Sequence, residues 1–356
     1  MEYFLRKMKI RGKTLNLPAF FPDATRGFIK CLDDEDLNRT KTSGVVVNAY
    51  HLLKENKIKE IKQKKGIHNF MNFKKIILSD SGGFQVMSLI HKSPKLGEIS
   101  DDKVIFNLDG KKIYFTPEKC IQTQIDIGSD IIMCLDECTH SEKTFQKQKQ
   151  SVLRTILWAK KCKQEFEKLT KRKKQKPLIF AIVQGGNYKS LRRLCAEELI
   201  KIGFDGYAFG GWPVKNKKLL TKILKYTSEL IPDDKIKYCM GVGKPKDILE
   251  CVKFGYNLFD CVIPTREARH KKIYLFNSSK GLGYKTLDIR GKHKNSKKII
   301  SKFCDCELCK KYSLGELYSF FERNNEMGKQ LASIHNLVFY KTFMTRLDKL
   351  LNKKEI

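Results

Sequence analysis

The chain is 356 residues long, 41% of them hydrophobic, and carries a formal net charge of +32. It contains no run of about 18 apolar residues and no signal-peptide pattern at its start, which argues against a membrane protein and predicts a cytoplasmic one. The charge favours a polyanionic partner such as nucleic acid, because each Lys or Arg that neutralises a phosphate adds affinity. Low-GC coding bias, which enriches Lys, Ile and Asn together, is a second explanation of the same charge.

Short apolar runs that end at polar or glycine residues recur along the chain and predict strands. They cover residues 44–48, 76–80, 131–136, 178–184, 207–210, 238–242 and 258–262. Residues 151–169 and 190–202, which lie between these runs, have the apolar spacing of helices. The alternation predicts an α/β fold with a parallel sheet covered on both faces. An irregular (β/α)8 TIM barrel fits best, and a doubly wound sheet is the alternative.

Polar residues gather at the carboxyl ends of these predicted strands. They are Asn48, Asp80, Asp136, Gln184, Gly210, Gly211, Gly243 and Asp260. In a barrel the carboxyl ends of the strands meet at one mouth, where active sites are built. A purely structural origin would scatter such residues over both ends, so the pattern favours a site.

The last predicted strand contains a single carboxylate, Asp260, among Leu, Phe, Val and Ile. An unpaired carboxylate is costly to bury, so it must be hydrogen-bonded or used in chemistry. Arg266 and Arg269 follow closely, and their guanidinium groups suit phosphate. We expect them to favour the charged form of Asp260. A structural aspartate that caps the next element is the alternative for this segment taken alone.

Three of the twelve cysteines form a C-x-C-x2-C cluster, namely Cys304, Cys306 and Cys309. Three thiolates at this spacing suit tetrahedral zinc, and His335, on a predicted helix, is the only histidine downstream. Four protein ligands leave no open position, so we expect one structural zinc ion rather than a catalytic one. The other nine cysteines are expected to be small buried hydrophobic residues.

Two interruptions of the pattern predict the domain organisation. Residues near 95–115 are expected to form a hairpin inserted into a barrel core of residues 1–270. Residues 271–356 are expected to form a zinc-binding subdomain and closing helices that pack on the barrel.

Several motifs, in order, resemble those of the tRNA-guanine transglycosylase (queuine tRNA-ribosyltransferase) family over nearly the whole chain. The carriers are Asn-Ala-Tyr-His-Leu (48–52), Asp-Ser-Gly-Gly-Phe-Gln-Val (80–86), residues 128–139, Ile-Val-Gln-Gly-Gly (182–186), residues 203–211, Met-Gly-Val-Gly-Lys-Pro (240–245), residues 259–266, and the cysteine cluster with His335. The resemblance implies a (β/α)8 barrel with a zinc subdomain. It also implies an enzyme that exchanges guanine at the wobble position of tRNA, within a G-U-N anticodon, for a 7-deazaguanine base.

Carried over residue by residue, the resemblance implies two catalytic residues, Asp260 as the nucleophile at C1′ of the ribose and Asp80 as the proton acceptor. It implies base binding by Ser81, Gly82, Gly83, Phe84, Asp136, Gln184, Gly211 and Met240. It implies RNA binding by Gly241, Lys244, Asp247, Thr265, Arg266 and Arg269, and a homodimer as the assembled form. We also expect the glycine pairs at 82–83, 185–186 and 210–211 to let backbone approach a flat ligand closely.

Three segments depart from the family pattern. Residues 21–30 begin Phe-Pro-Asp-Ala-Thr where the family usually has Pro-Val-Gly-Thr. Residues 210–216 read Gly-Gly-Trp-Pro-Val-Lys-Asn where bacterial members typically have Gly-Gly-Leu-Ala-Val-Gly-Glu, which leaves open whether preQ1, queuine or another base is used. Residues 313–321 differ in the region of the family's dimer contact, so the dimer geometry is open as well.

Two other functions remain as alternatives. A non-catalytic tRNA-binding partner subunit would lose its acidic catalytic residues, whereas Asp80 and Asp260 are both present. A related transglycosylase that acts on DNA is disfavoured by the RNA-contact segments and stays open.

Overall fold

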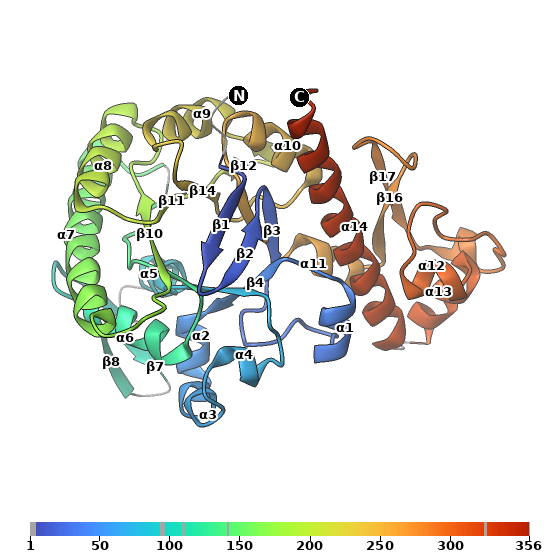
Figure 1. The fold of residues 1–356 in the computed structure, drawn as a ribbon, viewed down its shortest axis with the longest axis horizontal. Helices are drawn as coiled ribbons and strands as arrows, with labels where there is room; N and C mark the ends of the chain where they lie inside the picture. Colours follow the sequence, from blue (N-terminus) through green and yellow to red (C-terminus); the bar gives the residue numbers. More distant parts are fainter. Residues whose placement is uncertain (1–4, 93–96, 109–110, 141, 324–325, 356) are drawn as a thin grey trace.

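The computed structural model describes residues 5–92, 97–108, 111–140, 142–323 and 326–355. Its centre is an eight-stranded parallel sheet in the order β3-β15-β14-β11-β10-β9-β5-β4, which curves into a barrel (Figure 1). The strands are β3 (Ala19–Pro22), β4 (Gly44–Asn48), β5 (Ile76–Asp80), β9 (Ile131–Met133), β10 (Leu178–Val183), β11 (Gly206–Phe209), β14 (Ile236–Cys239) and β15 (Leu258–Cys261). They are buried almost throughout, as expected of parallel strands covered on both faces.

The barrel closes between its first and last strands in the sheet order. Asp23 forms a parallel bridge with Val46, and the Ala24 N–H donates to the Val46 carbonyl at 2.7 Å. The Asn48 N–H donates to the Thr25 carbonyl at 3.1 Å on the other side of this bridge. The predicted barrel is therefore confirmed over the doubly wound sheet. β3 was not among the predicted strands, and the strand predicted at 131–136 is too long, since β9 ends at Met133.

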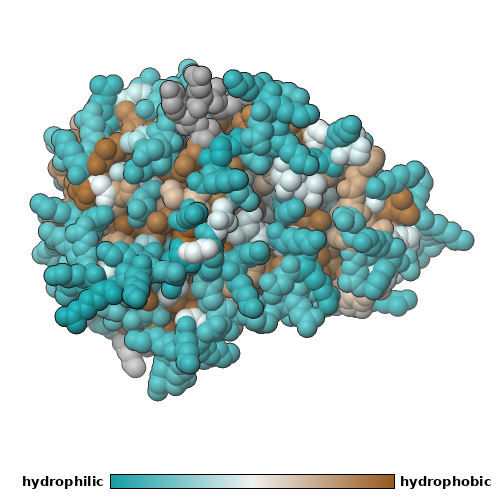
Figure 2. All heavy atoms as spheres, in the orientation of Figure 1, coloured by the Kyte–Doolittle hydropathy of each residue, from teal (hydrophilic) through white to brown (hydrophobic). Residues whose placement is uncertain are grey.

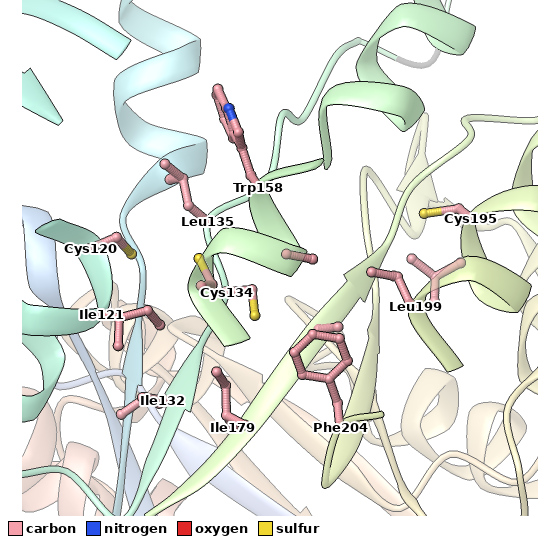
Figure 3. Close-up of a cluster of buried hydrophobic side chains, with 14 of the residues drawn as sticks. Cys120, Ile121, Ile132, Cys134, Leu135, Trp158, Ile179, Cys195, Leu199 and Phe204 are labelled. Atoms are coloured by element: carbon pink, nitrogen blue, oxygen red, sulfur yellow. The ribbon is translucent and has the colours of Figure 1, made fainter. Parts of the chain in front are cut away.

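Helices form the outer layer of the barrel (Figure 1). They are α1 (Asp34–Arg39), α2 (Ala49–Lys54), α3 (Lys57–Gln63), α4 (Ile67–Phe70), α5 (Gly83–Lys92), α6 (Pro117–Ile127), α7 (Phe145–Thr170), α8 (Lys189–Ile202), α9 (Thr221–Leu230), α10 (Pro245–Lys253) and α11 (Ile263–Arg269). Figure 3 shows how α6, α7 and α8 pack on the sheet, with Trp158, Cys134 and Phe204 in one buried cluster. Burial of such large side chains is the main source of the barrel's stability.

Small antiparallel sheets decorate the barrel. The pair β1 (Lys7–Ile10) and β2 (Lys13–Asn16) covers its amino-terminal end, because Ile10 and Leu15 pack in the same cluster as Ile76 and Ile131 at the starts of their strands. The strands β6 (Gly97–Ile99), β7 (Val104–Leu108) and β8 (Lys111–Phe115) form a three-stranded sheet at the expected insertion. Residues 95, 96, 109 and 110 of that expected hairpin lie outside the described residues. The pair β12 (Val214–Lys215) and β13 (Lys218–Leu219) follows β11.

The C-terminal part begins with the hairpin β16 (Lys272–Phe276) and β17 (Tyr284–Asp288). It continues with η2 (Gly291–His293), α12 (Glu307–Lys311), α13 (Leu314–Glu322) and the long α14 (Glu326–Asn352). In Figure 1 α14 runs between the barrel and this smaller unit. The Asn336 side chain donates to the carbonyls of Pro264 (2.9 Å) and Lys272 (3.1 Å), which ties α14 to the start of α11.

Hydrophilic side chains cover most of the face shown in Figure 2, with small hydrophobic areas between them. Within the described part of the chain, no helix combines the length and apolar character needed to cross a membrane.

Candidate active site

A pocket of about 470 Å³ opens at the carboxyl ends of the barrel strands. Its lining includes Asp23, Thr25, Val46, Asn48, Asp80, Phe84, Gln85, Asp136, Cys138, Ile182, Gln184, Gly211, Trp212, Pro213, Val214, Tyr238, Met240, Gly241, Asp260, Cys261 and Val262. Four of these residues are aspartates, and none is a lysine or an arginine. The pocket is therefore an anionic, partly apolar cavity in the place where barrel enzymes bind substrates.

Asp80 is the last residue of β5 and points into this pocket. The Asn48 side chain donates to its Oδ2 at 2.7 Å. The pKa of Asp80 is raised to about 7, mainly by burial and then by the nearby carboxylates of Asp136 and Asp260. The N–H groups of Gly82 and Ser81 lower this pKa by less. A carboxyl with this pKa is divided between its two protonation states at neutral pH, which suits a group that both gives and takes a proton.

Asp260, in β15, receives two hydrogen bonds on one carboxylate oxygen. The Tyr238 hydroxyl donates to Oδ1 at 2.8 Å and the Gly241 N–H donates to it at 2.9 Å. Burial raises the pKa of Asp260 to about 6, while these two donors lower it. The second oxygen has none of these bonds, and at neutral pH the carboxylate is mostly ionised, as a nucleophile must be.

The expectation that Arg266 and Arg269 favour the charged form of Asp260 was wrong. The groups that oppose burial there are Gly241 and Tyr238, and neither arginine is among the causes of its shifted pKa. The physical reason is the turn into α11, a helix whose last turn carries both arginines while Asp260 faces the barrel interior.

Asp136 and Gln184 form a hydrogen-bonded pair deep in the pocket. The Gln184 Nε2 donates to Asp136 Oδ2 at 2.6 Å, and both side chains are almost completely buried. Burial raises the pKa of Asp136 to about 6, against the lowering effect of Gln184. A carboxylate and an amide side by side present both acceptors and donors, which suits the mixed donor and acceptor edge of a purine.

Arg192 holds the two glycine loops that follow β10 and β11. It is 1% exposed and donates to the carbonyls of Val183 (2.6 Å), Gly186 (3.0 Å) and Gly210 (2.9 Å). Burial lowers its pKa to about 10, so it stays charged at neutral pH. Arg192 was not predicted as a site residue, because an arginine in an amphipathic helix is expected at the surface.

Aromatic rings form one wall of the pocket. Phe84 is 41% exposed, and its ring lies 5.4 Å from that of Trp212, edge to face. The centroid of the His140 ring lies 5.1 Å from that of Trp212. An exposed ring at a pocket mouth is available for stacking on a planar ligand.

The expected site residues divide into three groups by position. Asp80, Phe84, Asp136, Gln184, Gly211, Met240, Gly241 and Asp260 line the pocket. Ser81, Gly82 and Gly83 instead form its supporting turn, in which the Ser81 hydroxyl accepts from the Gly83 N–H at 3.1 Å. Arg266 is exposed and Lys244 and Arg269 are half-buried, whereas Asp247 and Thr265 are buried below the surface on which RNA is expected.

Some glycines of the three expected pairs are required for packing within the protein. A Cβ on Gly82 would lie 2.9 Å from the Tyr50 backbone nitrogen, and one on Gly210 would lie 2.5 Å from the Gln184 side chain. These glycines therefore allow protein to pack against protein. Of the three pairs, only Gly211 lines the pocket.

The pocket residues that were not predicted as site residues include Asp23, Cys138 and Tyr238. Tyr238 could have been suspected, because a tyrosine inside a barrel strand needs a partner for its hydroxyl. Asp23 follows a strand that was not recognised, so it had no expected position.

The cluster of Cys304, Cys306, Cys309 and His335 lies outside the barrel, with all four ligand atoms within 4.8 Å of one another. The three sulfurs lie 3.6, 3.4 and 3.3 Å from His335 Nδ1. Tetrahedral coordination at usual zinc bond lengths separates such atoms by roughly 3.6–3.8 Å, so the residues fit one metal ion. His335 Nε2 lies 2.8 Å from the Tyr274 carbonyl, a contact that orients the ring for coordination through Nδ1.

The fold and the pocket together define a barrel enzyme whose paired carboxylates suit transfer of a glycosyl group. Comparison with known proteins identifies its family. The profile described as "Queuine tRNA-ribosyltransferase" matches residues 5–355. The chain therefore belongs to the queuine tRNA-ribosyltransferase family.

Individual relatives agree over most of the chain. A protein named queuine tRNA-ribosyltransferase from Buchnera aphidicola subsp. Schizaphis graminum is 38% identical over 348 residues, which is 97% of this chain and 91% of the relative. Proteins of the same name from Actinobacillus pleuropneumoniae serotype 3 (39% over 335 residues, 93% of this chain and 84% of the relative) and Mannheimia succiniciproducens (38% over 340 residues, 94% and 85%) are also similar.

Proposed function

We propose that this chain is a tRNA-guanine transglycosylase that exchanges guanine at the wobble position of G-U-N tRNA for a 7-deazaguanine base. The observation that carries the proposal is the placement of Asp80 and Asp260 in one pocket with the buried Asp136–Gln184 pair. The relatives' shared name, which specifies transfer of tRNA ribosyl groups to queuine, supports the same reaction.

In the first step, a carboxylate oxygen of Asp260 attacks C1′ of the ribose. The bond from C1′ to N9 of guanine breaks, its electron pair stays on guanine, and a ribosyl–aspartate ester forms. Protonated Asp80 gives its proton to the departing guanine. Its pKa of about 7 makes the required acid form available at neutral pH.

In the second step, the incoming base takes the place of guanine. Ionised Asp80 accepts a proton from its five-membered-ring nitrogen, that nitrogen attacks C1′, and the ester oxygen leaves as the Asp260 carboxylate. The tRNA backbone remains intact because only the base–sugar bond is exchanged. The same carboxylates serve guanine and its replacement, so the reaction is symmetrical.

Base recognition is assigned to the floor and walls of the pocket. Asp136, Gln184 and the Gly211 N–H read the purine edge, while Phe84 and Met240 lie against the faces of the ring. Arg266 and Arg269 hold the backbone phosphates near the wobble position. The charge of +32 adds attraction for the rest of the tRNA.

The cysteine cluster is proposed to hold one structural zinc ion. All four positions around the metal are filled by protein, so the ion stabilises the fold of residues 271–356 and takes no part in base exchange. In this division, residues 1–270 form the catalytic barrel. The assembled form is proposed to be a cytoplasmic homodimer, to be tested by the mass of the purified protein in solution.

The exchange reaction is tested with labelled guanine and tRNA bearing a G-U-N anticodon. Wild-type protein is expected to incorporate label, and Asp260→Asn is expected to incorporate none and to form no covalent RNA adduct under denaturing conditions. Asp102→Asn, which alters an exposed carboxylate paired with Lys161, is the matched control. Absence of label with the wild type would favour a partner subunit, and label in a DNA duplex alone would favour the DNA enzyme.

Competition identifies the incoming base. PreQ1 and queuine are added separately to the same assay, and the base that prevents incorporation of labelled guanine at lower concentration is the physiological class. Trp212 and Pro213, in the wall of the pocket, stand where the family pattern has Leu and Ala, so the preference is expected to change in Trp212→Leu.

Metal analysis tests the zinc proposal. Purified native protein is expected to contain one zinc per chain, and Cys306→Ser is expected to lose it and to unfold in part. Cys31→Ser is the matched control, since Cys31 lies outside the cluster. The proposal would be contradicted if wild-type protein, purified without a chelator, contained no zinc.

A further inference from the structure

Asp23 is a carboxylate at the pocket mouth that the proposed exchange reaction does not use. It follows β3 directly and bridges to Val46 at the seam where the barrel closes. The family pattern usually has a valine at this place, whereas this chain has an ionisable group.

The strand register places Asp23 on the same side as Asp260 and nearer to the opening. Asp260 pairs with Phe21 and Cys261 pairs with Pro22 in the parallel ladder. Side chains alternate along a strand, so Asp23 points to the same side as Phe21, roughly 6–7 Å further along β3. The negative charge of Asp23 acts on Asp260. Burial is the main cause that raises the pKa of Asp260, and Asp23 raises it further.

One oxygen of this carboxylate is free to accept a hydrogen bond. The Thr25 hydroxyl donates to Oδ1 of Asp23. Across the described residues, no donor is bonded to Oδ2. Both Asp23 and Thr25 line the pocket, so a bound substrate can reach this acceptor.

The stereochemistry of the proposed attack determines which substrate group lies there. A nucleophile that displaces the base of a β-nucleoside approaches C1′ from the face opposite the base. The 2′-hydroxyl lies on that same face, and the 3′-oxygen is esterified within an RNA chain. The 2′-hydroxyl is therefore the hydrogen-bond donor of the ribose that lies on the face attacked by Asp260. It is also the group that distinguishes RNA from DNA.

We propose that Asp23 accepts a hydrogen bond from the 2′-hydroxyl of the nucleotide whose base is exchanged, and so selects ribose over deoxyribose. This inference rests on the proposed function, because it takes the position of the sugar from attack by Asp260. It makes Asp23 a specificity residue rather than a catalytic one.

The test uses two anticodon stem–loop RNAs that differ only in having guanosine or 2′-deoxyguanosine at the wobble position. Wild-type kcat/KM for guanine exchange is expected to be about tenfold higher on the all-ribose RNA, the effect of one hydrogen bond to a charged group. In Asp23→Val, the residue of the family pattern, this ratio is expected to fall to near one. Asp102→Asn, remote from the pocket, is expected to keep the wild-type ratio.

The outcomes separate this inference from the proposed function. If wild-type protein exchanges guanine but Asp23→Val keeps the wild-type ratio, or lowers both activities equally, the inference is overturned while the function stands. If wild-type protein exchanges neither RNA, the proposed function fails. Binding of the two RNAs, followed by fluorescence anisotropy with wild type and Asp23→Val, then decides the inference: a ribose preference lost in the variant supports it, and equal affinities overturn it.

Discussion

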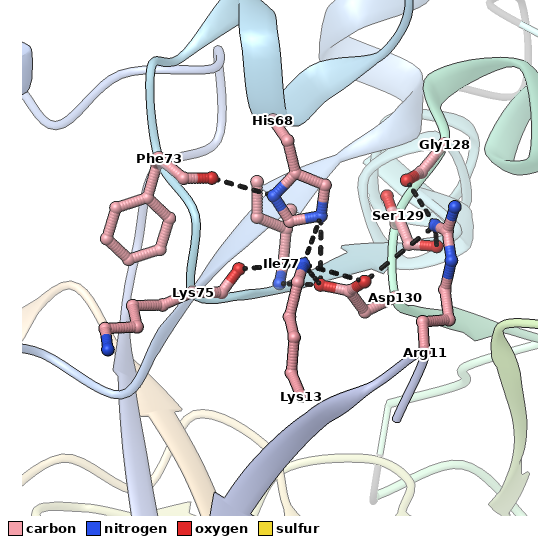
Figure 4. Close-up of polar contacts among 9 residues, drawn as sticks. All are labelled: Arg11, Lys13, His68, Phe73, Lys75, Ile77, Gly128, Ser129 and Asp130. Carbon is pink, nitrogen blue, oxygen red and sulfur yellow. Dashed lines mark hydrogen bonds and ion pairs between the residues drawn. The ribbon is translucent and has the colours of Figure 1, made fainter. Parts of the chain in front are cut away.

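Buried carboxylates at the two ends of the barrel have opposite electrostatic surroundings. At the amino-terminal end, Asp130 is 0% exposed and lies among cations, as Figure 4 shows. Lys13 donates to its two oxygens at 2.9 and 3.1 Å, and His68 Nε2 lies 3.0 Å from Oδ2. At the mouth, Asp80 and Asp260 receive hydrogen bonds from neutral groups, Asn48, Tyr238 and the Gly241 N–H.

The pKa values follow from this difference. Burial acts on Asp130 as well, but His68, Lys13 and the Ile77 N–H outweigh it and lower its pKa. At the mouth burial prevails, so the pKa of Asp80 is raised to about 7 and that of Asp260 to about 6. A buried carboxylate that is paired with cations stabilises the fold. A buried carboxylate without cations lowers the stability of the fold and is available for chemistry.

The largest expected effect that tests this comparison is on catalysis. Asp80→Asn is expected to lower kcat for guanine exchange by about 10³-fold, because the amide can neither give nor take the proton. Asp130→Asn is expected to keep kcat within about threefold at a temperature where it is folded, since Asp130 lies at the opposite end of the barrel. The measurement is steady-state exchange of labelled guanine at saturating tRNA. An equal loss of kcat in both variants would mean that the two ends are not functionally distinct.

The acidic residues at the mouth could be predicted from the sequence, but the direction of the pKa shift of Asp260 could not. Asp80, Asp136 and Asp260 were expected at the mouth because each lies at or near the end of a short apolar run, and parallel strands bring their ends together. The pKa of Asp260 was expected to be lowered by Arg266 and Arg269. Its actual surroundings come from residues distant in sequence, and no local pattern encodes them.

The fold was predictable to a similar degree. Seven strands were predicted from short apolar runs, but β3 consists of Ala-Phe-Phe-Pro and follows a loop without a helix before it. Recognition of β3 needs the closed barrel, in which Phe20 and Phe21 are buried between neighbouring strands. Asp23 was missed for the same reason. The group of three cysteines and His335 that could hold a metal ion, by contrast, was predicted from the cysteine spacing and the single downstream histidine.

The second expected effect is on stability at the amino-terminal end. Asp130→Asn is expected to lower the free energy of unfolding by about 3 kcal/mol at pH 7, because Lys13 and Arg11 lose the charge that compensates them. Chemical denaturation measures it. The control is again the exposed Asp102→Asn, whose expected change in the free energy of unfolding is below about 0.5 kcal/mol. Asp205→Asn is less suitable, because Asp205 Oδ2 accepts a hydrogen bond from the Ile179 N–H.

The smallest expected effect is a gain in the free energy of unfolding, and it depends on pH. The pKa values of Asp80 and Asp260 are raised on folding, so each contributes stability below the unfolded value near pH 4 and loses it as pH rises through about 6 to 7. At pH 8 both carboxylates therefore destabilise the fold, and Asp260→Asn is expected to raise the free energy of unfolding by about 1–2 kcal/mol. The gain should shrink below pH 6 and vanish near pH 4.

Asp130 provides the opposite profile in the same experiment. Its lowered pKa gives stability that is present above the unfolded value and lost as pH falls below about 4, so the cost of Asp130→Asn should be smallest in acid. Denaturation curves of both variants and the wild type from pH 4 to pH 8 measure the two profiles together. A loss of stability at pH 8 in Asp260→Asn would mean that Tyr238 and Gly241 stabilise the charged form more than burial opposes it, and the mouth would then resemble the other end of the barrel.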